Sequence, residues 1–310
     1  MVADAKIHSG AGHLMRCLRY SQEFSKRNIK TFLIGSIEIP WILESDIIDN
    51  FFSISQKKDL NFKPGDLIIV DSYDFENISW LSDVASKFPV IQIVDDVTDF
   101  INDAYIVNLN PVNSNLSDFK VDNDRYFWGI KYFPCTKILK KSNPTDTLFI
   151  GGGGDANDFS LEILKNFKKI DDIEMHFHLF SRFTESQKQV PKLTLHKLGF
   201  DLNKVLPQCV NVVSAAGTSV WDFLANGFNL AVVKSVSNQN NNYNFLVDNS
   251  LAIGLGEYNH DSWTLDYEAL RKFLFNTKSE SRNNMENLGL DFLGGKRFVS
   301  LALDIFQNFY

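Results

Sequence analysis

The stretch "KKSNPTDTLFIGGGGDANDFSLEILKNF" (residues 140–167) decides how the chain is divided. Its first seven residues are polar and contain a proline, which is typical of a linker between domains. The run at 147–155 is an apolar strand pattern that ends in four glycines, and 158–167 has the pattern of a capped helix with Leu161, Leu164 and Phe167 on one face. The stretch therefore predicts a linker followed by the start of a second α/β domain.

Similar patterns occur on both sides of this linker. Short apolar runs that end in Gly, Asp or Asn are typical of buried parallel strands, and the first half holds four of them: 31–35, 67–71, 90–96 and 105–110. Further strands are expected at 173–180, 210–217 and 230–236, and helices at 13–27 and over much of 265–310. We predict an α/β fold of two Rossmann-type parallel-sheet domains, 1–141 and 142–310, facing an interdomain cleft, with the last helix able to pack back on the first domain.

Composition limits the class of protein. Of 310 residues, 44% are hydrophobic and 22% charged, which indicates a globular chain, and a net charge of −7 argues against nucleic-acid binding. The sequence shows no bilayer-spanning run and no signal peptide pattern, so we expect a cytoplasmic protein without membrane insertion. The three cysteines lie far apart without a CxxC pair, which favours neither zinc nor disulfides. We expect no cofactor, and the oligomeric state stays open.

The first candidate site is "HSGAGHLMRCLRY" (8–20). Gly10 and Gly12 precede a helix pattern that carries His13 and Arg16 in its first turns. Backbone N–H groups at a helix start suit an anion, and the same potential favours a neutral imidazole that can accept a proton. The alternative is an ordinary glycine turn with a capping histidine, because the full dinucleotide signature is missing.

Three loops of the second half are candidates for nucleotide binding. The glycine run, with Gly152 and Gly153, suits close backbone approach to a ligand. In "SAAGTSVWDFLANG" (214–227), Thr218 or Ser219 can cap a helix, and Asp222 can accept hydrogen bonds from ribose or simply suit the helix dipole. Asn238 and Gln239 follow the next strand and can contact a sugar or base, although such loops are often only solvated.

Two further clusters are weaker candidates for metal sites. His176 and His178 alternate in a strand pattern and so share one face, but no third ligand accompanies them. The acidic run at 94–100 is explained more simply as a strand end followed by a turn. We therefore predict no metal site.

Taken in order, the segments "ADAKIHSGAGHLMRCLRYSQEF", "VDSYDFE", "VDDVTDF", "GGGGDANDFSLEIL" and "SAAGTSVWDFLANGFNLAVVKSVSNQ" resemble the PseG/SpsG family. These are UDP-2,4-diacetamido-2,4,6-trideoxy-beta-L-altropyranose hydrolases, related to the MurG-like glycosyltransferases of the GT-B fold. The resemblance covers roughly residues 1–300. It implies a GT-B-like fold and hydrolysis of a UDP-linked deoxyamino sugar for nonulosonic acid or surface polysaccharide synthesis.

The resemblance also assigns roles to residues. It implies that His13 is the general base that activates water and that Tyr73 lies near it. The nucleotide-binding positions that it implies, together with those expected from the loops themselves, are Gly10, Gly12, Arg16, Gly152, Gly153, Ser214, Ala216, Gly217, Thr218, Ser219, Asp222, Asn238 and Gln239.

The sequence departs from the family pattern at three places. Asp222 stands where the family usually has a glutamate, Ser72 stands in the segment that often reads Asp-His-Tyr, and the first strand is as short as if the chain began late. Two other functions stay open: a GT-B glycosyltransferase that uses the same UDP-sugar site, and a nucleotide-sugar-binding protein without turnover.

Overall fold

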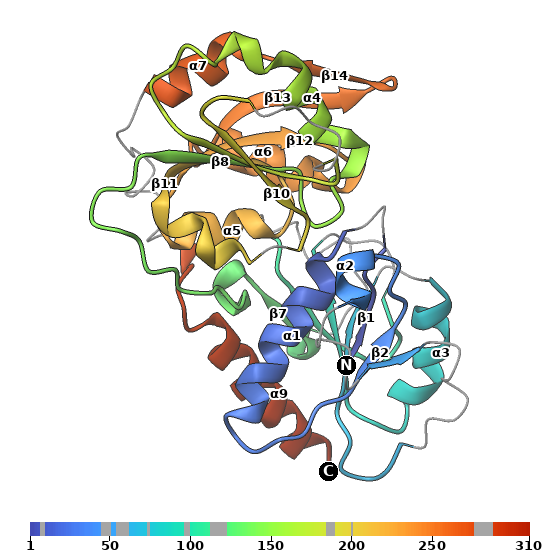
Figure 1. Ribbon diagram of the computed structural model, residues 1–310. Coiled ribbons are helices and arrows are strands. Elements are labelled where there is room, and N and C mark those ends of the chain that lie inside the picture. Colours follow the sequence, from blue (N-terminus) through green and yellow to red (C-terminus); the bar gives the residue numbers. More distant parts are fainter. Residues whose placement is uncertain are drawn as a thin grey trace. The chain divides into compact units, whose positions relative to one another are not determined.

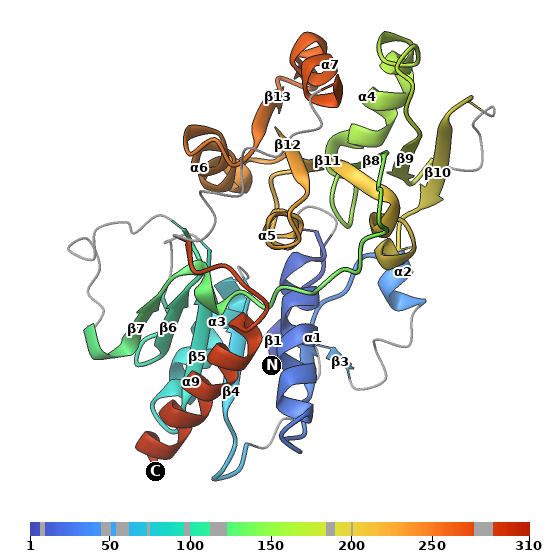
Figure 2. The same cartoon turned by 90° about the vertical axis from the view of Figure 1, so that its left-hand side faces the viewer.

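The computed structural model describes residues 1–6, 10–44, 51–53, 62–72, 75–95, 100–111, 123–183, 190–199, 201–275 and 288–310. The chain forms two compact units, seen in Figures 1 and 2. The first contains Met1–Cys135 together with Leu288–Tyr310, and the second contains Thr136–Asn287. The division thus falls six residues before the expected boundary after residue 141, and the chain returns to the first unit at its end.

The first unit is built on a seven-stranded sheet in the order β3-β2-β1-β4-β5-β6-β7, and every strand pair in it is parallel. Its strands are β1 (Val2–Ala3), β2 (Leu33–Gly35), β3 (Phe51–Ser53), β4 (Ile68–Asp71), β5 (Val90–Val94), β6 (Tyr105–Asn108) and β7 (Tyr126–Trp128). Strand β1 is the third of the seven strands, beside the central strand β4, so the loop that follows it leaves the carboxyl edge of the sheet near its middle. Ligands of open α/β sheets bind at that edge.

The helices of the first unit are α1 (Gly12–Ser25), α2 (Pro40–Leu43), α3 (Phe75–Ala85) and α9 (Gly294–Phe309), with 3-10 turns η4 (Asn123–Arg125) and η5 (Ile130–Tyr132). Helix α9 lies beside α1 (Figure 1), and the rings of Tyr20 and Phe298 stack with centroids 3.9 Å apart. Helix α9 begins at Gly294 against the segment after η5, where a Cβ on Gly294 would lie 2.0 Å from the carbonyl oxygen of Phe133, so only glycine fits there.

The second unit has its own seven-stranded sheet in the order β10-β9-β8-β11-β12-β13-β14, parallel except for the last pair. Its strands are β8 (Asp146–Ile150), β9 (Phe177–Ser181), β10 (Leu193–Lys197), β11 (Cys209–Ala215), β12 (Asn229–Lys234), β13 (Ile253–Asn259) and β14 (Ser262–Leu265). Its helices are α4 (Phe159–Asn166), α5 (Ser219–Ala225), α6 (Asn240–Asp248) and α7 (Tyr267–Phe275), with 3-10 turns η6 (Ala156–Asp158), η7 (Phe167–Lys169), η8 (Leu202–Lys204), η9 (Leu206–Gln208) and η10 (Ser237–Gln239).

The sequence prediction of two parallel-sheet halves is confirmed, and local details differ. The strand expected at 173–180 begins only at Phe177. The predicted cap of α4 is wrong, because Asp158 is in the left-handed region and makes no capping hydrogen bond. Of the predicted core face, Phe167 is buried in the core and Leu164 packs against it, but Leu161 is only partly buried, and the buried positions of the helix are Phe159 and Ile163.

Candidate active site

His13 lies in the first turn of helix α1 in the first unit. The chain leaves β1, turns at Gly10 with a φ of +78°, and enters α1 at Gly12. The turn favours glycine because other residues rarely adopt this φ. The N-cap residue of α1 is Ala11, and His13 lies inside the helix, so His13 does not occupy the capping position of the alternative interpretation. Arg16 follows three residues later on the same face, and both side chains are buried.

Two carboxylates from neighbouring strands meet these side chains. Asp71 ends β4, the strand next to β1, and Asp95 follows β5, the next strand in the sheet. Asp71 Oδ1 lies 2.6 Å from His13 Nδ1. Arg16 donates from Nε to Asp71 Oδ2 at 2.6 Å and from Nη1 to Asp95 Oδ1 at 2.6 Å. A second pair of bonds runs from Arg16 Nη2 to Asp71 Oδ1 and Asp95 Oδ2 at 2.7 and 2.9 Å. The guanidinium therefore bridges the two acids.

The charges of this cluster determine which group donates the hydrogen bond between His13 and Asp71 and which accepts it. Burial alone would raise the pKa of Asp71, but the charges and hydrogen bonds of Arg16 and His13 outweigh burial and hold it at about 2. Asp71 is therefore an anion at neutral pH and can only accept a hydrogen bond, so the nitrogen that contacts it carries the proton. His13 Nδ1 must be that donor, which leaves Nε2 as the nitrogen with the lone pair. This is the tautomer that a general base needs.

The imidazole lies in a buried cluster with two carboxylates and one guanidinium, and Arg16 hydrogen bonds to both acids. Because Asp71 is fixed by Arg16 on its other oxygen, it orients the imidazole instead of moving with it.

The sequence does not single out the two acids of this cluster as site residues. Asp71 lies in the segment "VDSYDFE" that carries the family resemblance, and the acidic run at 94–100, which contains Asp95, is explained more simply as a strand end followed by a turn. A signal was present, because both acids directly end adjacent buried strands whose carboxyl ends meet at one edge. Tyr73, predicted beside His13, lies outside the described residues, as do His8 and residues 96–99 of the acidic run.

In the second unit, the glycine loop after β8 contains a buried acid. Asp155 is in the left-handed region with a φ of 48° and accepts hydrogen bonds from the backbone N–H of Ser160, at 3.0 Å, and from its hydroxyl. A Cβ on Gly151 would lie 2.4 Å from Asp155 Oδ1, so packing alone explains this glycine. Gly152 has a φ of +93° with open space around it. Close ligand approach therefore stays a prediction for Gly152 and Gly153.

The three predicted nucleotide loops lie together at one edge of the second sheet. They follow β8, β11 and β12, which are adjacent in the sheet order. Asn157 Nδ2 donates to the carbonyl of Ser235, at 2.5 Å, and so joins the first loop to the third. Asn242 Nδ2 donates to the carbonyl of Ala216, at 3.3 Å. Gly217 lies next to the Gln239 side chain, because a Cβ on this glycine would be 3.8 Å from Nε2.

The remaining predicted residues of this edge have distinct surroundings. Gln239 Oε1 accepts the backbone N–H of Ser235 at 2.9 Å, while Asn238 is exposed. Ser214 is buried, and its hydroxyl donates to the carbonyl of Ala215 at 2.9 Å. Thr218 precedes α5 and Ser219 begins it, but the predicted cap is wrong, because the N-cap residue Thr218 makes no side-chain capping bond.

Asp222 accepts a hydrogen bond from the first residue of the second unit. It is buried, and its Oδ1 accepts the backbone N–H of Thr136 at 2.8 Å. One turn later, Asn226 accepts from the N–H of Ile138 at 2.7 Å and donates to the carbonyl of Thr136 at 2.8 Å. Helix α5 thus holds an irregular segment of chain, a role that the sequence did not reveal. Ribose contact by Asp222 stays a prediction.

His178 of β9, with His176 just before the strand, lies beside a third histidine, His196 of β10. His178 Nδ1 lies 3.0 Å from His196 Nε2, and the rings of His176 and His178 meet with centroids 4.9 Å apart. Their shared face was predicted from the sequence. Burial, with the nearby His178 and His176, lowers the pKa of His196 to about 4, and burial also lowers the pKa of His178. Over the described ranges, no group of three or more His, Cys, Asp or Glu is arranged to hold a metal ion.

This histidine cluster predicts a loss of stability in mild acid. Below about pH 6.5 the unfolded chain binds protons at these positions, while folded His196 does so only near pH 4. Stability therefore falls as pH drops through this window, by about 1 kcal/mol after allowance for solvent screening. Urea unfolding at pH 7 and pH 5 measures this loss. His196→Gln should reduce it, whereas His260→Asn, at an exposed turn, should leave it unchanged; equal losses in all three proteins would contradict the assignment.

Within the part of the chain that the structure describes, no helix is long and apolar enough to cross a membrane.

No protein-family model matches the sequence, and comparison with curated proteins gives no match. Solved structures do match over nearly the full length. Acinetobacter baumannii MurG is 14% identical with a TM-score of 0.57, covering 98% of this chain and 99% of its own. Arabidopsis thaliana UGT89C1 complexed with UDP is 11% identical with a TM-score of 0.67, covering 98% of each chain. The glycotransferase of kitacinnamycin is 12% identical with a TM-score of 0.67 and the same coverage. These likenesses show that the chain has the GT-B fold.

Proposed function

We propose that this protein is a UDP-sugar hydrolase that cleaves the anomeric C–O bond of a UDP-linked deoxyamino sugar. His13 takes a proton from a water molecule, the water oxygen bonds to the anomeric carbon, and the electrons of the broken bond leave with UDP. The products are UDP and the free sugar.

The buried His13–Asp71 pair is the observation that carries the proposal. A 2.6 Å contact between a carboxylate and Nδ1 holds the imidazole in the tautomer whose Nε2 accepts a proton. The pair lies at the carboxyl edge of a parallel sheet, where ligands of this fold class bind. A base positioned in this way contributes on the order of 10²–10⁴-fold to a reaction rate.

Nucleotide binding is assigned to the loops of the second unit. Gly152 and Gly217 carry no Cβ that would keep a ligand away from the backbone, and backbone N–H groups in such loops can bind the diphosphate and stabilise the charge that develops on the leaving UDP. The support is the clustering of these loops at one sheet edge and the sequence resemblance to UDP-sugar hydrolases. A fold that is shared with a UDP-complexed glycosyltransferase agrees with this assignment.

A glycosyltransferase is the second candidate, favoured by the names of the matching structures. The two reactions differ in whether water or an acceptor hydroxyl attacks the anomeric carbon. The test is to incubate the protein with UDP-linked diacetamido-trideoxyhexoses and their epimers without an acceptor, and to analyse the products by mass spectrometry. We expect UDP and free sugar from one of these substrates. Turnover that occurs only when an acceptor is added would assign a transferase, and tight UDP binding without turnover would assign a binding protein.

A further inference from the structure

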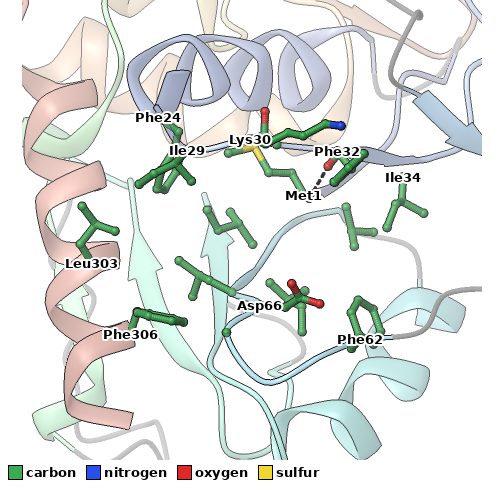
Figure 3. Close-up of a pocket in the computed structure, with 16 residues that line it drawn as sticks. Met1, Phe24, Ile29, Lys30, Phe32, Ile34, Phe62, Asp66, Leu303 and Phe306 are labelled. Carbon is green, nitrogen blue, oxygen red and sulfur yellow. Dashed lines mark hydrogen bonds between the residues drawn. The ribbon is translucent and has the colours of Figure 1, made fainter. Parts of the chain in front are cut away.

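The two edges of the first sheet differ in polarity. At the amino edge, a cavity of about 610 Å³ is lined largely by apolar side chains, among them Phe24, Leu303 and Phe306 (Figure 3). At the carboxyl edge lie the charged side chains that surround His13. The predicted nucleotide loops lie at the carboxyl edge of the second sheet, and one of them has an unusual backbone.

The loop after β8 holds three non-glycine residues in the left-handed region within four positions. The φ angles of Asp155, Asn157 and Asp158 are 48°, 56° and 56°. Residues other than glycine rarely adopt this region, and they remain in it only where neighbouring groups hold the chain. Backbone conformations of this kind are concentrated at ligand-binding and catalytic sites. The surroundings of this loop therefore bear on what the loop does.

Each of the three residues is held by a group from another element. Asp155 accepts hydrogen bonds from the backbone N–H and the hydroxyl of Ser160, in α4. Asp158 pairs with Arg182, which follows β9. This ion pair also offsets the charge of Asp158, which would otherwise repel an anion from the loop. Asn157 is bound twice, through its side chain and through its carbonyl group.

The side chain of Asn157 connects the glycine loop to the other two loops of this edge. Its Nδ2 donates to the carbonyl oxygen of Ser235 at 2.5 Å. The backbone N–H and the hydroxyl of Ser235 in turn donate to Gln239 Oε1 at 2.9 and 3.1 Å. Gln239 lies next to Gly217, in the loop after β11. One side-chain amide therefore sets the position of the glycine loop relative to the loops after β11 and β12.

Trp263 of β14 holds the backbone of the same asparagine. Its Nε1 donates to the carbonyl oxygen of Asn157 at 2.7 Å. The indole packs against the rings of Phe159 and Tyr258, with centroids 5.3 and 5.4 Å away. Because these ring contacts restrict the indole, its N–H keeps one direction. Asn157 is thus held by a donor that belongs to none of the three loops.

We propose that Asn157 and Trp263 are positioning residues of the nucleotide site, which hold the glycine loop in the conformation that binds the diphosphate of UDP. This inference rests on the proposed function. Gly152 has open space around it, and residues 152–155 form consecutive turns. Backbone N–H groups in such turns form concave anion sites. A loop that is ordered before the ligand arrives binds it more tightly, because less conformational entropy is lost on binding.

The test measures the affinity of full-length variants for UDP and for uridine, which lacks the diphosphate. Asn157→Gly removes the side-chain amide, and glycine adopts a φ of 56° readily, so the loop can still reach its conformation. Trp263→Phe removes the N–H and keeps an aromatic ring against Phe159. We expect each variant to bind UDP about 10-fold more weakly, as loss of one hydrogen bond and of loop order predicts, with the uridine affinity unchanged.

Asn28→Gly is the matched control. It alters another asparagine of positive φ, 58°, in the first unit, and should bind both ligands as the wild type does. Ligand-observed NMR titration gives both affinities, and thermal unfolding shows that each variant is folded. Should Asn157→Gly not fold, Trp263→Phe decides the outcome.

Two results would overturn this inference while the wild type still binds UDP. One is an unchanged UDP affinity in the folded variants. The other is an equal loss for UDP and uridine, which would make the two residues general supports of the fold. A wild-type protein that does not bind UDP would overturn the nucleotide assignment itself, and this inference with it.

Discussion

Replacing His13 with asparagine is expected to lower the rate of UDP-sugar hydrolysis by about 10²–10⁴-fold, with little change in the affinity for UDP. The asparagine side chain is close in size to the imidazole and can still hydrogen bond to Asp71, so the fold should persist. It cannot accept a proton from water at neutral pH, which removes the base but not the nucleotide loops of the second unit. Steady-state kinetics and calorimetric titration with UDP measure the two effects separately.

A matched control comes from the other buried histidines. His178→Asn alters a histidine of similar burial in the second unit, away from the predicted chemistry, and should retain most of the activity. A folded His13→Asn protein that hydrolyses its UDP-sugar at the wild-type rate would remove His13 from the mechanism. A drop in UDP affinity equal to the drop in rate would instead make His13 a binding residue.

Replacing Asp71 with asparagine should impair both stability and rate. One carboxylate now serves three donors, His13 Nδ1 and two nitrogens of Arg16, and the amide has a single oxygen for them. The buried guanidinium keeps only Asp95 as a full counter-charge, and loss of a buried partner costs about 3–5 kcal/mol. An amide N–H turned toward His13 would also move the ring proton to Nε2, so we expect a rate at least about 10²-fold lower.

Replacing Asp95 with asparagine separates the expected effect on stability from the expected effect on rate. Asp95 contacts Arg16 through both carboxylate oxygens, and its side chain is 23% exposed. This variant removes the charge of one of the two acids that bind Arg16, and it leaves the contact between Asp71 and His13 in place. We expect a loss of stability with a much smaller loss of rate. If Asp95→Asn and Asp71→Asn lower the rate equally, Asp71 acts through packing alone and does not orient the imidazole.

The overall architecture could be predicted because the local patterns agree with the global fold. Runs such as 67–71 and 147–150 are apolar on both faces, which only a covered parallel sheet accommodates, and the polar proline-containing stretch separates the two halves. The chemistry of His13 could be proposed from its place after two glycines and in the first turn of a helix. Both inferences depend on residues that are close together in the sequence.

What could not be predicted depends on pairings distant in sequence. The bond between His13 and Asp71 joins residues 58 positions apart, and it requires the strand order in which β4 lies next to β1. The use of Asp222 to hold Thr136 has the same origin, since helix α5 meets a segment 86 residues earlier in the chain. Two predicted helix caps are wrong for local reasons. Asp158 has a left-handed backbone conformation and makes no capping hydrogen bond, and the side chain of Thr218 makes no hydrogen bond to its helix.

Hydrolysis in water enriched in oxygen-18 tests the central claim most directly, because it reports which bond breaks and what attacks. If water activated by His13 attacks the anomeric carbon, the label enters the free sugar at its anomeric hydroxyl and the released UDP stays unlabelled. Because free sugars exchange this oxygen slowly with solvent, the products are analysed early in the reaction, with unlabelled sugar in labelled water as the control. Label in the phosphate of UDP would show cleavage of the P–O bond and contradict the account.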